Sequence, residues 1–169
     1  MGTDVGALPP GTFLMRLSPA LQTLWAQVPQ GWSPDDVAVD AQGNLLAAGR
    51  VPHAATPDDY SSDLVVVKLS PGGQELWRRV LVASDTAQAW SVAVDAQGNV
   101  VVGGHASGVL RFGTASLPQA PDRPLLMKLD ASGNLFLTGG HAGSVDTGAG
   151  VFGSASSNLY EGLLLRLAP

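Results

Sequence analysis

The chain contains no cysteine, which excludes disulfide bonds, thiolate metal sites and cysteine nucleophiles. Charged residues are also scarce, at 14% of the chain, and the formal net charge is −5. The only adjacent basic residues, Arg78 and Arg79, follow an expected strand. With no basic stripe to neutralise phosphates, we expect no nucleic-acid partner.

Long hydrophobic runs are missing as well. No stretch approaches the roughly 18 apolar residues that a membrane-spanning helix needs, so we expect no membrane insertion. The first residues, MGTDVGALPPGTFLMRL, have no basic segment followed by an apolar one and therefore do not form a secretory signal. We expect a cytoplasmic protein as the chain stands, or a secreted or cell-surface one if it is excised from a longer precursor.

A repeat is the main positive feature of the sequence. The octapeptide VAVDAQGN occurs at 37–44 and again at 92–99, and RLSPALQTLW (16–25) aligns with KLSPGGQELW (68–77). Each copy reads as an apolar strand, a turn, a strand ending in tryptophan, a loop and a DAQGN hairpin, with no helical periodicity. The sequence therefore predicts an all-β protein.

The expected organisation is one domain over 1–169 built from repeated four-stranded units. The first unit covers about 13–50, the second about 64–104 and a partial third about 125–140, and a final strand lies at about 162–168. The third unit either has lost its tryptophan strand or is a hairpin of third and fourth strands. This count predicts 11 strands.

These motifs resemble those of a known repeat family. Apolar-K-L-x-x-x-G-x-x-L-W followed by A-V-D-x-x-G-N is similar to the bacterial SBBP-type β-propeller repeat, and SPGGQELW is similar to the repeats of quinoprotein propellers. The resemblance implies four-stranded antiparallel blades, of which fewer than three are present. Propellers have about four to eight blades, so we expect the incomplete propeller to close by homo-oligomerisation.

The DAQGN segments have a structural and a metal-binding interpretation. Asp40 and Asp95 can accept backbone hydrogen bonds within a turn, while Gly43 and Gly98 can take positive φ. Calcium loops need oxygen ligands at alternate positions, and this spacing is absent. We therefore expect tight turns, no metal site and no cofactor.

Two catalytic motifs occur in form only. VDTGA (145–149) matches the core of aspartic proteases at Asp146, but it lies in a Gly/Ser-rich segment without the flanking apolar strands. GAGVFG (148–153) spells G-x-G-x-x-G, but SASSN follows it where a dinucleotide site needs a helix. We expect no catalytic residue, and a protease at Asp146 remains a remote alternative.

His53, His105 and His141 each follow an expected fourth strand, so they are expected on one rim of the domain. There they are either exposed loop residues or, as a further alternative, a metal site or acid–base groups. The loops between second and third strands and the connections between units are expected to share one face. Their aromatic and charged residues are the candidates for a ligand face, because such side chains stack on and hydrogen-bond sugars or peptides. The candidates are Trp32, Asp35, Asp36, Tyr60, Trp90, His105, Arg111, His141 and Tyr160.

The sequence thus predicts a non-enzymatic repeat scaffold or binding module that associates with itself. The alternative is a lectin-like module that binds a glycan or a peptide through the loop face.

Overall fold

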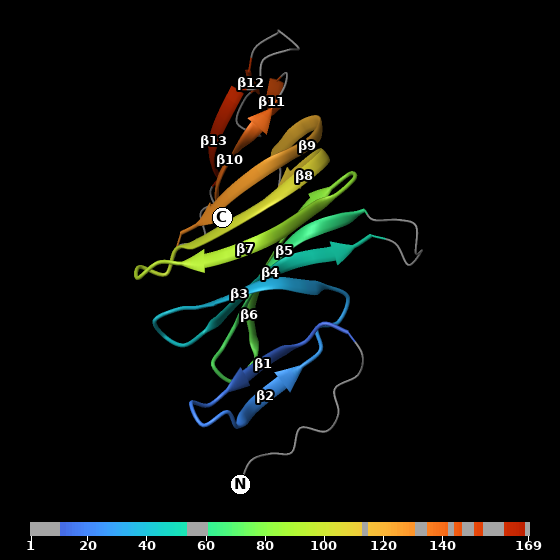
Figure 1. The fold of residues 1–169 in the computed structure, drawn as a ribbon. Coiled ribbons are helices and arrows are strands. Elements are labelled where there is room, and N and C mark those ends of the chain that lie inside the picture. The colour runs from blue at the N-terminus through green and yellow to red at the C-terminus, as the bar shows by residue number, and fades with distance from the viewer. Residues whose placement is uncertain are drawn as a thin grey trace.

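The computed structural model describes residues 11–53, 61–112, 115–130, 135–141, 144–146, 151–153 and 161–167. Every regular element in these residues is a β-strand, which confirms the all-β prediction (Figure 1). The described residues contain 13 strands rather than the 11 expected, because two short strands follow β10. The strands are β1 (Leu14–Leu17), β2 (Thr23–Gln27), β3 (Ser33–Val39), β4 (Leu45–Pro52), β5 (Ser62–Leu69), β6 (Glu75–Ala83), β7 (Ala87–Val94), β8 (Val100–Phe112), β9 (Ala115–Leu129), β10 (Leu135–His141), β11 (Ser144–Asp146), β12 (Val151–Gly153) and β13 (Glu161–Leu167).

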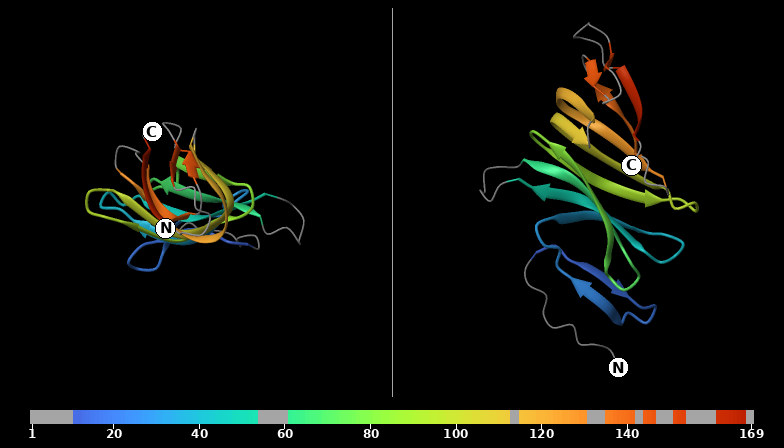
Figure 2. Two further views of the ribbon diagram at one scale, coloured as in Figure 1. Left: turned by 90° about the horizontal axis from the view of Figure 1, so that it is seen from above. Right: turned by 180° about the vertical axis from the view of Figure 1, so that it is seen from behind.

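The strands stack in three layers along the chain (Figure 1). The first layer is the hairpin β1–β2, which forms a sheet of its own. The middle layer is the antiparallel meander β3-β4-β5-β6. The third layer contains β7, β8, β9, β10 and β13, paired in that order. The middle and third layers join where the end of β6 pairs with β8, and together they form a curled half-barrel (Figure 2).

Hydrogen bonding does not divide the strands as the sequence repeats do. The middle layer combines the third and fourth strands of the first repeat with the first and second strands of the second repeat. In the described residues β2 pairs only with β1, although both lie in the expected first unit with β3 and β4. The reason is packing: the hairpin β1–β2 lies on the face of the middle layer rather than at its edge.

The third layer repeats the register of the middle layer. Leu45 pairs with Leu69 in the β4–β5 ladder, and Val100 pairs with Leu129 in the β8–β9 ladder. Since β10 then pairs with β9 as β6 pairs with β5, it takes the place of the tryptophan strand. The segment 125–140 is therefore a first strand followed directly by a shortened substitute for the second.

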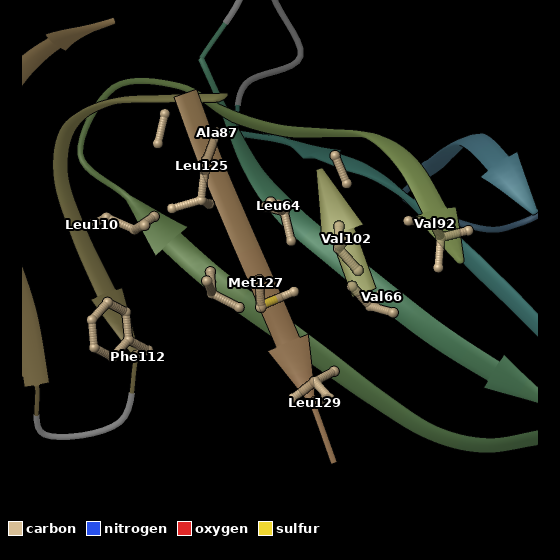
Figure 3. Packing of buried hydrophobic residues seen from close by; sticks show 14 of the residues in the cluster. Leu64, Val66, Ala87, Val92, Val102, Leu110, Phe112, Leu125, Met127 and Leu129 are labelled. Carbon is tan, nitrogen blue, oxygen red and sulfur yellow. The ribbon is translucent and has the colours of Figure 1, made fainter. Parts of the chain in front are cut away.

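Two apolar clusters hold the layers together. The larger cluster lies between the middle and third layers and includes Leu64, Val66, Val102 and Met127 (Figure 3). The smaller one lies between the first and middle layers. It contains Leu14, Trp32, Ala47, Val65, Val67 and Leu69. Alternate residues of β5 enter opposite clusters, because successive strand side chains point to opposite faces. The middle layer is thus covered on both sides.

Candidate functional site

The candidates for the ligand face that the structure describes are distributed over different parts of the fold. Trp32 is only 6% exposed and packs in the cluster between the first and middle layers. The guanidinium of Arg78 lies 5.6 Å from the centre of its ring, which is within cation–π range. One edge of Trp32 lines an open hollow of about 720 Å³ together with His53. Trp32 is therefore mainly a packing residue.

Asp35 and Asp36 connect two layers. Asp36 Oδ2 accepts a hydrogen bond of 2.8 Å from the backbone NH of Val92, and Asp35 Oδ2 accepts one of 3.0 Å from Gln88 Nε2. Both donors belong to β7, so the carboxylates fix β3 of the middle layer against β7 of the third. In this arrangement their hydrogen-bonding capacity is partly used within the chain.

Trp90 is the exposed aromatic residue among the described candidates, at 56% exposure. It lies in a β-bulge between Ala89 and Ser91, and a bulge redirects the side chain of the extra residue. Gly104 lies across from this bulge, where a Cβ would be 2.1 Å from the carbonyl oxygen of Gln88. Glycine is therefore required at position 104 for the bulge to form.

The indole of Trp90 stacks on His105, with ring centroids 4.5 Å apart and the planes tilted by 33°. His105 Nε2 lies 3.8 Å from Asp122 Oδ1, and its buried Nδ1 has no hydrogen-bond partner among the described atoms. An exposed indole face beside an imidazole and a carboxylate is suited to stacking on, and hydrogen bonding to, a small polar ligand. We call Trp90, His105 and Asp122 the Trp90 site.

Of the remaining candidates, the structure describes the side chain of Arg111 and places it away from the Trp90 site. Arg111 is exposed and pairs with Val82 of β6, further along β8 than His105. The backbone of His141 pairs with Glu161, but its side chain lies outside the described residues. Tyr60 and Tyr160 lie outside them altogether.

The histidines that can be placed do not converge on a metal. The imidazole of His53 pairs with Asp63, whose Oδ1 also accepts a hydrogen bond of 2.9 Å from the backbone NH of Ala83. Within the described part of the chain, no three His, Asp or Glu side chains are grouped so that they could hold a metal ion. Asp146 pairs through its backbone with Val151 and Ser116, whereas 147–149 of the VDTGA motif fall outside the described residues.

The DAQGN turns form as expected. Asp40 Oδ1 accepts hydrogen bonds from the backbone NH groups of Gln42 and Asn44, and Gly43 has a φ of 79°. Burial by itself raises the pKa of the Asp40 carboxyl, but hydrogen bonds from Lys68 and Asn44 and the charge of Lys68 outweigh it and hold that pKa at about 2. The carboxylate is therefore ionised and fully engaged in stabilising the turn.

An exposed apolar groove is the surface feature that sequence reasoning missed. It has a volume of about 470 Å³, and its apolar lining comes from Val101, Leu126 and Phe136 on the outer face of the third layer. A second apolar surface lies at the other end of the stack, where Phe13 is 54% exposed and Met15 and Leu17 are exposed beside it. We call these surfaces the third-layer groove and the first-layer face. Aligning the repeats residue by residue would have found both.

Compared with known proteins, the chain matches no protein-family model and no curated protein. None of the described residues forms a helix long and apolar enough to cross a membrane.

Proposed function

We propose that this protein is a non-enzymatic repeat scaffold that associates with itself through the two ends of its layer stack. The observation that carries the proposal is a difference in burial between equivalent residues. Leu46 and Val66 face the third layer and are 0% exposed, whereas their counterparts in the third layer, Val101 and Leu126, line the groove. In the middle layer this face is covered by the next layer, whereas in the third layer Leu126 is 49% exposed.

The opposite end of the stack has the same property. Val65 and Val67 face the first layer and are buried, whereas their counterparts Phe13 and Met15 are exposed. Contiguous exposed apolar surface of this kind is typical of interaction sites. At both ends, therefore, the exposed apolar residues are equivalent in the repeat to residues that form layer contacts inside the molecule. If a second copy covers them, the apolar area that is buried stabilises the assembly as it stabilises the internal contacts. The resemblance to propeller repeats is consistent with a closed ring of such layers.

Static light scattering across a dilution series tests this function. We expect a mass that is a multiple of 17.3 kDa and that decreases on dilution only below the dissociation constant. A mass of 17.3 kDa at every concentration would overturn the proposal.

A second function is favoured by the Trp90 site, namely binding of a glycan or a peptide. Its support is the exposed indole stacked on His105, whose buried Nδ1 has no partner in the described structure. Ligand binding would quench or shift Trp90 fluorescence, and Trp90→Ala would abolish saturable binding on a glycan or peptide array. Trp32→Phe is the matched control, since Trp32 is buried away from this site. If no ligand on such arrays binds, or if binding survives Trp90→Ala, this second function is wrong.

A further inference from the structure

The contact between the first and middle layers is made by an aromatic ring and a glycine turn. The ring of Trp25 lies on the SPGG turn of the next layer, so close that a Cβ at Gly73 would be 3.0 Å from Trp25 Cδ2. Trp25 Nε1 and Arg16 Nη1 both donate hydrogen bonds to the carbonyl oxygen of Pro71, at 2.9 and 2.7 Å. The tryptophan of the first layer therefore packs against the glycine of the middle layer's turn.

The aromatic residue at the position of Trp25 differs at the C-terminal end of the stack. Trp25 pairs with Arg16 in the first layer, Trp77 pairs with Lys68 in the middle layer, and Phe136 pairs with Lys128 in the third. Phe136 thus occupies the tryptophan position, with a smaller ring. It lines the third-layer groove.

The residue at the position of Gly73 differs at the N-terminal end of the stack. The turns at 18–22 and 70–74 have the same hydrogen bonds: Leu21 donates to the Ser18 carbonyl and Gly73 to that of Ser70, both at 2.9 Å. Leu21 occupies the glycine position with a φ of 58°, a conformation that strains any residue with a branched side chain. It is also 78% exposed. Nothing within the described chain accounts for a strained, exposed leucine in this turn.

The two differing residues, Phe136 at the tryptophan position and Leu21 at the glycine position, are complementary in size. A leucine in the place of Gly73 would collide with an indole, but a phenylalanine lacks the second ring and leaves room for it. We propose that the third-layer groove of one copy binds the first-layer face of a second copy, with Leu21 of that copy packed against Phe136. This contact rests on the proposed self-association and specifies its surfaces.

The rest of the contact follows the same alignment. Lys128 holds the place of Arg16 in the strand ladder, and its Nζ lies 3.9 Å from Asp95 Oδ2 of the same layer. Phe13 and Met15 cover Val101 and Leu126. Because two different surfaces meet, the contact is head-to-tail, and repeating it produces a ring or an open chain of copies.

A complementation experiment tests the pairing. Phe136→Asp blocks only the groove and Leu21→Asp blocks only the face, so each variant alone is monomeric by light scattering. Mixed in equal amounts they form a dimer and nothing larger, since one intact groove meets one intact face. Leu76→Asp is the control: Leu76 is exposed on the middle layer outside both surfaces, and this variant keeps the wild-type mass. Circular dichroism verifies that each variant is folded, and Leu126→Asp replaces Phe136→Asp if the latter unfolds.

The outcomes separate the two proposals. If the wild-type chain is monomeric, the self-association fails and this pairing fails with it. If the wild-type chain associates but either blocking variant retains its mass, or the mixture remains monomeric, association uses other surfaces and only the pairing is overturned.

A size exchange tests the Leu21–Phe136 contact itself. Phe136→Trp weakens association at least about tenfold, and adding Leu21→Gly in the same chain restores it by recreating the Trp25–Gly73 arrangement. Leu21→Gly alone relieves the positive-φ strain, so it raises the unfolding midpoint of the monomer while weakening association. If Phe136→Trp leaves the dissociation constant unchanged, Leu21 does not contact Phe136.

Discussion

The two copies of VAVDAQGN fold into the same turn in two different environments. Asp40 and Asp95 accept the same hydrogen bonds from their asparagines, Asn44 and Asn99. The Asp40 carboxylate is nevertheless fully buried with Lys68 Nζ at 2.9 Å, whereas that of Asp95 is 37% exposed and 3.9 Å from Lys128 Nζ. Identical sequence therefore gives identical local geometry, and the number of covering layers decides the electrostatics.

The same contrast applies to the pKa of the two carboxyls. That of Asp40 is held at about 2 in spite of burial, chiefly by Lys68 and Asn44. That of Asp95 is lowered mainly by the hydrogen bond from Asn99, with a smaller opposing effect of burial. Lys68 and Asn44 together thus hold the carboxylate of the middle-layer turn, whereas Asn99 is the main partner of the carboxylate of the third-layer turn.

The largest loss of stability is expected at the β-bulge glycines, Gly49 of the middle layer and Gly104 of the third, where the two layers have the same geometry. A Cβ at Gly49 would be 2.0 Å from the Ser33 carbonyl oxygen, and one at Gly104 would be 2.1 Å from that of Gln88. Because these obstacles are backbone atoms, Gly49→Ala and Gly104→Ala should each lower the free energy of unfolding by about 3 kcal/mol or prevent folding. Gly72→Ala is the control, since its Cβ would meet only Ser70 Oγ at 3.8 Å. Urea denaturation measures all three, and unequal losses at Gly49 and Gly104 would mean that the two bulges differ.

The next largest effect compares a leucine on a covered face of a layer with a leucine on an exposed face. Leu46 is 0% exposed under the third layer, whereas Leu126 is 49% exposed on the outer face. Leu46→Ala should destabilise the protein by about 3 kcal/mol, because it opens a cavity, and Leu126→Ala by less than about 0.5 kcal/mol. Urea denaturation must be carried out in dilute solution, where the groove is free. Equal losses would show that the outer face is covered within the monomer.

A smaller difference is expected at the two turns. Asp40→Asn removes a buried charge-assisted bond to Lys68 and should cost about 2 kcal/mol of unfolding free energy. Asp95→Asn should cost clearly less, because water already reaches that carboxylate. Thermal denaturation at pH 7 compares them, and a larger loss for Asp95→Asn would contradict the role given to layer burial.

The acid dependence of stability gives the smallest effect. The pKa of Asp40 falls from its ordinary value of 3.8 to about 2 on folding, so its contribution is complete above about pH 4 and is lost as the pH falls toward 2. Asp40→Asn should therefore lose less stability than the wild-type protein between pH 4 and pH 2. Urea midpoints measured across this range test it, and parallel curves would mean that the Asp40–Lys68 pair does not form in solution.

The sequence predicted the local elements well. The DAQGN hairpin forms as expected, since its aspartate and glycine meet the requirements of one tight turn. The sequence places Trp32 and Trp90 on one face because both lie in or beside a loop between second and third strands, yet Trp32 is buried and Trp90 exposed. The repeat register distinguishes them: Trp32 aligns with the buried Ala87, whereas Trp90 aligns with Asp35 in the bulge.

The sequence by itself determined where the strands and turns lie, because alternation of apolar residues and glycine or aspartate chemistry act over a few neighbouring positions. Only the tertiary structure decided that the sheets cross the repeat boundaries, that the hairpin β1–β2 lies on a sheet face, and that Asp40 is buried while Asp95 is not. These features depend on which layers cover which faces. A layer can bury its apolar surface only against another layer, and no short stretch of sequence specifies that partner.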